Sequence, residues 1–461
     1  MPQFSWLTFA QAKTDLASRL ADPGEVYWID DEIGRYIVEA LRTWNALTNI
    51  WNAPYDLSPL IAANQSWYSL SSIANYPRVR TVTDSYLEIL MCYHLIEPPT
   101  LVAGFGYNFG FNFGLGASLG TGMFTIQQMA SALQRRRDEI NQLTACNIAE
   151  ITVGTVPGTR VNLFPDTTLS PLRARFLPAV GNPTTLWRND DLAFEYFSPN
   201  YLQGQAGPGQ SPGTGPKAYG VINSSPLGFA VDFPPRSPGA YDFLVNQSGP
   251  ILSPPNATVL GLPDDFTWVA KWGALSDLLA MESEVTDPAR ADYCLQRYRD
   301  GVTLLQRSPW ILLATINGIP VDTISVQEMD DYALGWETAP KSRCIVSPGL
   351  DFLAVSPVPT GAPLPSAGIT VVGNAPIPFL DTDYVQVSRD SYDVILDYSQ
   401  HLADFKMGGQ DFVQSQELAK NFFLAAIATN SRLAQLGLFR DLLTGQGMRQ
   451  NEIEPRFKKE E

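Results

Sequence analysis

Two similar stretches of sequence decide the fold: Ser225-Pro-Leu-Gly-Phe-Ala-Val-Asp-Phe-Pro-Pro235 and Ser347-Pro-Gly-Leu-Asp-Phe-Leu-Ala-Val-Ser-Pro-Val-Pro359. Each follows a similar tetrapeptide, Pro216-Lys-Ala-Tyr in the first case and Pro340-Lys-Ser-Arg in the second. Short apolar runs that Pro and Gly interrupt are typical of β-strands joined by turns. The matching order of these pieces predicts two copies of one β-rich module.

The surroundings of the two stretches match as well. An acidic segment lies upstream of each, Arg188-Asn-Asp-Asp before the first and Gln327-Glu-Met-Asp-Asp before the second. Downstream of each comes a pair of helical patterns with a charged turn, at Ser283-Glu-Val-Thr-Asp-Pro and at Lys406-Met-Gly-Gly-Gln-Asp. Each copy is therefore expected to be a β-plus-helix module, although convergent strand composition would give a similar pattern.

Helices are expected ahead of the first copy. Thr8 and Gln11 form a capping-box pattern at the start of one helix, which ends at Pro23-Gly24. Asp30 and Asp31 can cap a second helix. Its apolar residues form a stripe at helical spacing: Ile33, Ile37, Ala40, Leu41, Trp44 and Leu47. Such a stripe has to be buried against another element.

Two further helices complete the N-terminal region, one from Thr83 to Leu95 and one that starts at a capping box of Thr125 and Gln128. The sequence thus predicts an α+β fold: a helical bundle base with two inserted β-sandwich-like modules, each followed by return helices. The expected parts are an N-terminal helical region 1–150 with a Gly/Phe loop at 104–122, a first β-rich module 151–263, return helices 264–308, a second β-rich module 309–382, C-terminal helices 383–444 and a charged tail 445–461.

The composition excludes several classes of protein. The chain of 461 residues has 31 Lys and Arg against 47 Asp and Glu, a net charge of −16, and sequence-independent DNA binding needs clustered cations. The charge suits a surface that DNA passes without binding, and equally an ordinary acidic cytosolic protein. Four scattered cysteines without Cys-x-x-Cys spacing indicate neither a zinc site nor a disulfide framework. No basic segment precedes an apolar run at the start, and no stretch of about 18 uninterrupted apolar residues occurs, so we expect neither a secretion signal nor a membrane span.

The chain offers few residues for catalysis. His94 and His401 are its two histidines, and both are expected to pack inside the protein. The pairs Asp330-Asp331 and Asp381-x-Asp383 fall where helix caps or turns are expected, which explains these carboxylates without a ligand. The basic run Arg135-Arg136-Arg137 is expected on a solvated helix face or in salt bridges between subunits, and not on DNA. We therefore expect no enzyme, no cofactor and no bound metal.

Glycine alternates with aromatic residues across 104–122. These glycines fit no Gly-x-Gly-x-x-Gly register, so the segment does not indicate a nucleotide site. We expect a hairpin or glycine-rich loop that packs on a neighbouring subunit, because lone loops rarely expose so much aromatic surface. The candidate interface residues are Phe105, Tyr107, Phe109, Phe111 and Phe113.

The opening Thr8-Phe-x-x-x-Lys-x-x-Leu-Ala-x-Arg-Leu20, the paired acids after Trp28, and Glu39-Ala-Leu-Arg-Thr-Trp44 resemble the N-terminal helices of head-to-tail adaptor (connector or neck) proteins of tailed bacteriophages. Later segments, among them Leu262-Pro-Asp-Asp-Phe and Asp287-Pro-Ala-Arg-Ala-Asp-Tyr, are similar to their β insertion and return helices. The resemblance spans most of the chain as a pattern. Simple adaptors are much shorter, so the second β-plus-helix module is a departure from the family.

This resemblance implies a structural virion protein, assembled in the host cytoplasm, that forms a homo-oligomeric ring, commonly a dodecamer. The ring would dock under the portal protein and hold a downstream tail or neck protein. Genomic double-stranded DNA would pass through its channel without specific binding, and no membrane would take part.

The C-terminal tail would extend along the portal. Phe457 would fill a portal pocket, and Arg456, Lys458 and Lys459 would meet acidic side chains around it.

Two alternatives stay open: another tail or neck component, and a phage-associated glycan-binding or glycan-cleaving protein, which predicts an aromatic-lined cleft with paired acids.

Overall fold

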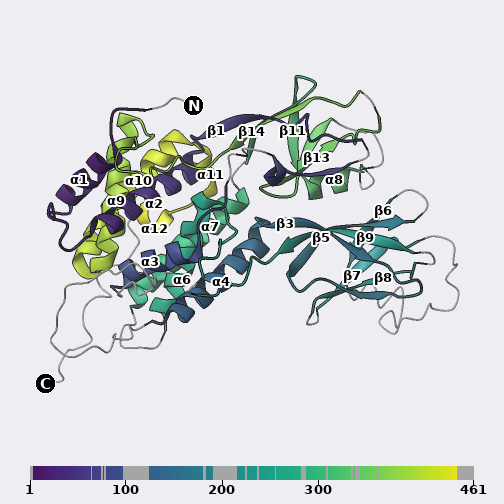
Figure 1. Ribbon diagram of the computed structural model, residues 1–461, viewed down its shortest axis with the longest axis horizontal. Coiled ribbons are helices and arrows are strands. Elements are labelled where there is room, and N and C mark those ends of the chain that lie inside the picture. The colour runs from purple at the N-terminus through teal and green to yellow at the C-terminus, as the bar shows by residue number, and fades with distance from the viewer. Residues whose placement is uncertain are drawn as a thin grey trace.

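A computed structural model gives the fold of the chain. It describes residues 4–63, 65–73, 76, 79–96, 124–179, 183–190, 215–223, 226–235, 238–254, 256–281, 287–307, 310–333, 336–337, 343–361 and 363–443. The Gly/Phe loop at 104–122 and the charged tail at 445–461 lie outside the described residues. The α+β class is confirmed, with most helices gathered in one half of the molecule and two β-sheets side by side in the other (Figure 1).

We call residues 79–307 the inner module. Its elements are α3 (Asp84–Leu95), α4 (Ile126–Thr144), β3 (Ile148–Gly154), β4 (Val161–Leu163), β5 (Thr168–Pro178), β6 (Thr184–Asn189), β7 (Ala218–Ile222), β8 (Gly228–Val231), β9 (Gly239–Gln247), the 3₁₀ helix η3 (Asp264–Phe266), α6 (Thr267–Leu279) and α7 (Pro288–Arg307).

The outer module lies on both sides of the inner module in the sequence. Before it come α1 (Phe9–Arg19), α2 (Asp30–Thr48), β1 (Asn52–Asp56), β2 (Trp67–Ser69) and η1 (Leu70–Ser72). After it come β10 (Ile311–Ile316), β11 (Ile319–Ser325), α8 (Val326–Ala333), β12 (Cys344–Ser347), β13 (Phe352–Ser356), β14 (Ala367–Val372), α9 (Arg389–Met407) and α10 (Gly409–Thr429). The short helices α11 (Arg432–Leu436) and α12 (Arg440–Leu443) follow.

The two sheets have the same topology. The inner sheet has the strand order β3-β9-β5-β6-β7-β8-β4 and the outer sheet the order β1-β14-β10-β11-β12-β13-β2. When the strands of each module are numbered along the chain from the start of that module, both sheets have the same order of strands. Neighbouring strands are antiparallel except for one pair in each sheet, β6 with β7 and β11 with β12, which again occupy the same place. One module is therefore present twice, as the repeated stretches of sequence predict.

The first copy in the sequence interrupts the second. The inner module is inserted between β2 and β10, so the outer sheet is built from strands almost 250 residues apart. This nesting differs from the expected succession of two modules on a helical base. The difference arises because β1 and β2 come from the region 1–150, which was expected to be helical.

A shared irregularity strengthens the equivalence of the sheets. The register between β5 and β9 shifts between Pro171 and Arg173, and the register between β10 and β14 shifts between Ile311 and Leu313. The extra residue is Leu172 in one bulge and Leu312 in the other, and both side chains are exposed. A bulge leaves one residue outside the ladder pairing, which explains an exposed leucine within a strand.

The helices repeat in the same manner. Thr8 pairs with Tyr384 ahead of α1 and α9, and Thr83 pairs with Val259 ahead of α3 and α6. Helices α2 and α4 both have 19 residues and end at a left-handed C-cap, Asn49 and Ala145 respectively. Thus α1, α2, α9 and α10 of the outer module correspond to α3, α4, α6 and α7 of the inner module.

Local signals in the sequence place most helix starts correctly. The capping boxes at Thr8 and at Thr125 are both present, and the break at Gly408-Gly409 separates α9 from α10. The expected cap of α2 is wrong, because Ile29 is its N-cap and Asp30 and Asp31 lie in its first turn. There the two carboxylates still face the positive end of the helix dipole.

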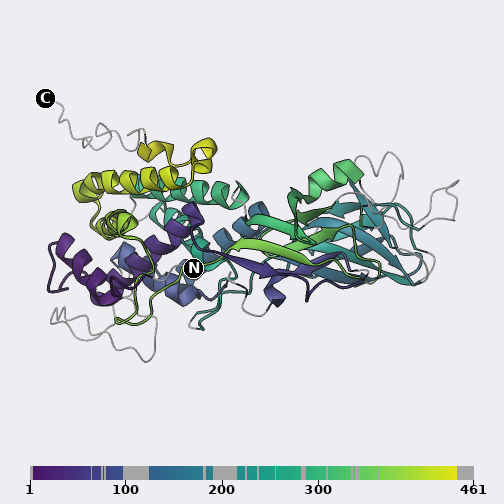
Figure 2. The same ribbon diagram turned by 90° about the horizontal axis from the view of Figure 1, so that it is seen from above.

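Each sheet encloses its own apolar core, whereas the helices share one. The buried side chains of both helical parts form a single cluster that runs from α1 to α12. The inner sheet closes over Phe229, Tyr241 and Phe243, and the outer sheet over Ile345 and Leu353. Seen from above, the helical half and the β half are joined end to end (Figure 2). The two modules are thus one body at the helical end and two curled sheets at the other.

Candidate functional site

The extended contact between the two modules, here called the seam, is the candidate functional site. Its helical part contains a buried charged cluster. Lys271 of α6 is fully buried, and its Nζ lies 2.5 Å from Oε1 of Glu39 on α2 and 3.0 Å from Nε2 of His94 on α3. Burial lowers the pKa of Lys271, and Glu39 opposes that shift. Burial, followed by the Lys271 charge, also holds the pKa of His94 well below its usual range.

A second buried carboxylate joins the modules nearby. Asp265 of η3 accepts hydrogen bonds from the side-chain amide of Asn45 at 2.5 Å and from the backbone N–H of Ala375 at 2.8 Å, both in the outer module. Its neighbour Asp264 accepts from the backbone N–H groups of Thr81 and Val82. Neither acid therefore caps the following helix with its side chain. Asp265 therefore connects the two modules through hydrogen bonds.

Asp265 should make the stability of the protein depend on pH. Burial raises its pKa to about 7 from an ordinary value of 3.8, against the pull of Asn45 and Arg42. The folded state then binds this proton more tightly than the unfolded state, so its contribution to stability falls as pH rises from about 4 to 7. The variant Asp265→Asn mimics the protonated acid and lacks this dependence. Relative to the variant, the wild type should lose up to about 1.4 kcal/mol per pH unit in urea unfolding. Parallel curves for the two proteins would contradict this.

Both histidines pack inside the helical part, as expected. The hydroxyl of Tyr293 on α7 lies 2.6 Å from Nε2 of His401 on α9, and Nδ1 of His401 lies 2.9 Å from Oγ of Ser415 on α10. Burial lowers the pKa of His401 to about 3. His94 packs against the rings of Trp272 and Phe405, one from each module. Their surroundings are those of neutral rings in a core.

The β part of the seam has an apolar centre. It consists of residues from both sheets and from α8: Trp67, Leu244, Met329, Trp336, Cys344, Val346, Phe352 and Ala354. The rings of Trp67 and Trp336 meet edge to face with centroids 5.7 Å apart. Leu244 on β9 belongs to the inner sheet, and the remaining seven to the outer module. The outer module therefore supplies most of the apolar surface that packs on one face of the inner sheet.

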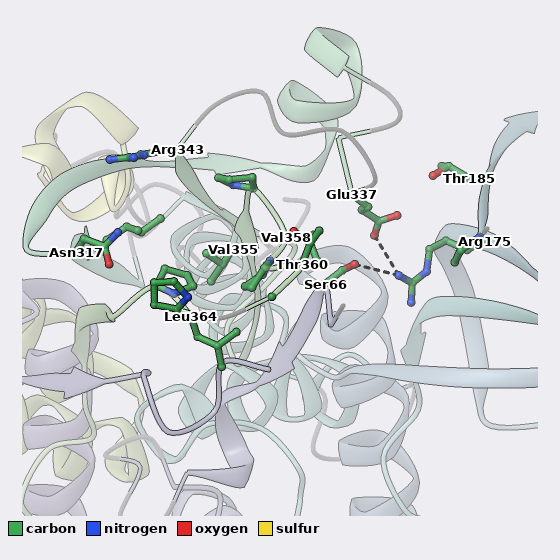
Figure 3. Close-up of a pocket in the computed structure, with 17 residues that line it drawn as sticks. Ser66, Arg175, Thr185, Asn317, Glu337, Arg343, Val355, Val358, Thr360 and Leu364 are labelled. Carbon is green, nitrogen blue, oxygen red and sulfur yellow. Dashed lines mark hydrogen bonds and ion pairs between the residues drawn. The ribbon is translucent and has the colours of Figure 1, made fainter. Parts of the chain in front are cut away.

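Charged residues surround this centre. Oε1 of Glu337 accepts from Nε1 of Trp67 at 2.6 Å, and Oε2 accepts from Nη2 of Arg173 at 3.3 Å. Oε1 also lies 3.8 Å from Nη1 of Arg175 (Figure 3). Arg173 also pairs with Asp330 on α8. Asp330 therefore neither caps a helix nor sits in a turn. Burial raises its pKa, while Arg173 opposes that shift.

The two modules use different surfaces at the seam. In the β half, β3, β5 and β9 of the inner sheet face β2, β12, β13 and α8 of the outer module. A two-fold arrangement would also place β1, β10 and β14 against β4, β7 and β8. Instead, the surface around β1, β10 and β14 is an open groove of about 460 Å³, lined among others by Pro54, Thr315 and Gly368.

The helical half shows the same asymmetry. Helix α2 packs on α3 and η3 of the other module, and α9 packs on α3. The equivalent elements pack within their own modules, α4 on α3, α6, α7 and β9, and α1 on α2 and α9. The modules are therefore joined head to tail: one surface type of the outer module meets a different surface type of the inner module.

A cavity of about 640 Å³ opens beside the β seam. Ser66, Arg175, Thr185, Asn317, Glu337 and Arg343 give it polar groups, and the proline-rich residues 357–361 and 363–365 form one wall (Figure 3). Glu337 is the one carboxylate among the described residues that line it, and it is already bonded to Trp67 and Arg173. Glycoside hydrolysis uses two carboxyl groups across the scissile bond. The cavity gives a glycan-cleaving site no support.

The other sequence-predicted site residues have mixed outcomes. Asp383 accepts the backbone N–H groups of Phe379 and Leu380, so its place in a turn is confirmed. Asp381 pairs with Lys13. Of the three arginines in the basic run, Arg135 and Arg136 pair with Asp277 on α6, whereas Arg137 is fully buried and donates to the carbonyl of Pro250. A solvated face is therefore wrong for Arg137.

The remaining candidate interface residues, Phe105, Tyr107, Phe109, Phe111, Phe113, Arg456, Phe457, Lys458 and Lys459, lie outside the described residues. Within the described ranges, no group of three or more His, Cys, Asp or Glu residues could hold a metal ion. No helix in the part of the chain that the structure describes has the length and apolar character to cross a membrane.

The seam residues Arg173, Arg175, Glu337 and Lys271 escaped the sequence reasoning. One signal was available for the arginines: in Leu172-Arg-Ala-Arg-Phe176 they alternate, which places both on one face of a strand. Lys271 stands alone in the apolar run Trp268-Val-Ala-Lys-Trp-Gly-Ala-Leu275, a pattern that requires a buried partner.

Comparison with known proteins does not identify a family. No protein-family model matches the chain, and no curated protein matches it.

Proposed function

We propose that this chain is a structural protein of a tailed-bacteriophage particle, a ring-forming adaptor between head and tail. The observation that supports the proposal is the head-to-tail seam between two modules of identical topology. When two equivalent units are joined through two different surfaces, the first unit keeps one of these surfaces free and the second unit keeps the other. Further units can then be added through the same contact, which generates closed rings or open filaments. A ring is the form that suits a passage for DNA.

In this proposal the helical bundle is the base and the two sheets project from it, as the resemblance of the sequence to adaptor proteins implies. The ring would dock under the portal and hold a tail or neck protein. The net charge of −16 suits a channel wall, because DNA repelled by its surroundings passes without binding. In this proposal the chain assembles in the host cytoplasm and becomes part of the virion.

Particle assembly in the absence of this chain tests the function. Heads should fill with DNA and remain without tails, and complementation with the full chain should restore tailed particles. Purified particles should contain the chain in a fixed ratio to the portal protein, as measured by quantitative mass spectrometry. Normal tailed particles in its absence would refute the proposal.

A further inference from the structure

We infer that a second copy of this chain docks on the first through a repeat of the internal seam, so that each chain fills two adjacent positions of the assembly. The face presented by α1 and α9 of one copy would bind the face presented by α4 of the next. This inference rests on the proposed ring and names the surfaces that close it.

The equivalence of the modules identifies these faces. At the internal seam, α2 packs on α3 and on η3, which directly precedes α6, and α9 packs on α3. The counterpart of α2 is α4, and the counterparts of α3 and α6 are α1 and α9. Aligned on the pairs Thr8–Tyr384 and Thr83–Val259, His94 corresponds to Arg19 and Trp272 to Asp397. Helices α2 and α4 have the same length, so Glu39 of α2 is equivalent to Arg135 of α4.

Residues that the internal seam buries have exposed counterparts on the two unused faces. Helix α2 is buried on almost every side, whereas α4 exposes a polar stripe with Gln127, Ser131, Arg135 and Gln142. The side chain of Arg135 is 61% exposed. On α3 the seam buries Tyr93 and His94, whereas their counterparts on α1, Ser18 and Arg19, are exposed. Both faces are polar, which suits a contact that forms between soluble chains.

The charges of the two faces are complementary. Inside the chain, the acid Glu39 comes from the α2 side and the base Lys271 from the other side. In the same alignment Lys271 corresponds to Leu396 on α9, and the carboxylates Asp393 and Asp397 lie within one turn of that position, both paired with Arg19 of their own chain. Between chains, Arg135 would come from the α4 side, where it pairs with Asp277, and meet these two carboxylates. The acid and the base exchange sides relative to the internal seam, and the two faces remain complementary in charge.

The β half offers a matching place. The open groove around β1, β10 and β14 is the counterpart of the face of the inner sheet that the outer module covers. Where the inner sheet carries Glu150, Arg175 and Asp242, the groove has Pro54, Thr315 and Gly368. Small side chains leave room there for the sheet edge of the next copy.

Charge reversal in the full-length chain tests the docking. We expect Arg135→Glu and Asp397→Lys each to weaken self-association at least about tenfold in sedimentation velocity over a concentration series, because each places like charges together. The double variant should associate like the wild type. So should an equimolar mixture of the two single variants, since every contact in an alternating assembly is then between opposite charges.

Asp322→Lys is the control, because it reverses an exposed carboxylate on β11, away from both helical faces. Circular dichroism establishes that each variant is folded. Rescue in the double variant or the mixture supports the docking even if a single variant is less stable. Wild-type chains that stay monomeric at every concentration, or single variants that associate normally, overturn it. If particles still require the chain for tails, the adaptor function stands and only this docking surface is wrong.

Discussion

Lys271→Met should destabilise the protein by about 3–5 kcal/mol in urea unfolding, because it leaves the Glu39 carboxylate without its cation in the core. The ammonium group also lies 3.7 Å from the ring centroid of Trp272, so a cation–π contact is lost with it. Lys271 and Glu39 belong to different modules. The variant should therefore loosen the helical seam and not a single helix.

Replacing both partners is the informative control. Lys271→Met combined with Glu39→Leu removes both charges and restores an apolar contact, so it should recover most of the lost stability. An equally unstable double variant would mean that packing, and not the unpaired charge, sets the cost. A Lys271→Met protein as stable as the wild type would show that water reaches this cluster.

Trp336→Ala should open the β seam. The indole is fully buried, donates from Nε1 to Asp330 at 3.0 Å, and lies under the guanidinium of Arg173. Truncation removes its buried surface and leaves a cavity, a loss of about 3–5 kcal/mol. Hydrogen exchange measured by mass spectrometry should accelerate in α8, β12 and β13, whereas the helical bundle should keep its protection.

Trp187→Ala is the matched control for this change, because Trp187 on β6 is 56% exposed. It should alter stability by less than about 0.5 kcal/mol. Acceleration throughout the molecule in Trp336→Ala would mean that the sheets and the bundle unfold together. Unchanged exchange in α8 would mean that the two sheets are held by the helices alone.

Local rules predicted those parts of the fold that depend on neighbours in the sequence. The capping boxes at Thr8 and Thr125, the buried stripe of α2 and the glycine break after α9 all follow from helix chemistry within a few residues. The order of similar strands also indicated two copies of a module. These features need no knowledge of distant partners.

The nesting of the modules could not be predicted in that way. Strand β1 has five residues with Pro54 at its centre, and β2 has three, so neither shows a usable alternation of burial. Their partners β14 and β13 lie about 300 residues away. A proline is tolerated in β1 because the strand is at the edge of its sheet.

The site was missed for a related reason. Asp264 and Asp265 stand directly before α6, a position where acids ordinarily act as helix caps, whereas the bonds of Asp265 go to Asn45 and Ala375. Likewise, Arg173 and Asp330 are more than 150 residues apart. Acidic residues before a helix have two uses, local capping and distant pairing, and the sequence does not distinguish them.

The most direct test of the central claim combines the mass and the image of the assembled protein. Native mass spectrometry counts the chains, and electron microscopy of the same sample counts the modules around the circumference. A head-to-tail seam repeated between chains predicts a closed ring with twice as many modules as chains. Compact two-fold dimers, or a ring in which each chain contributes one unit to the circumference, would contradict it.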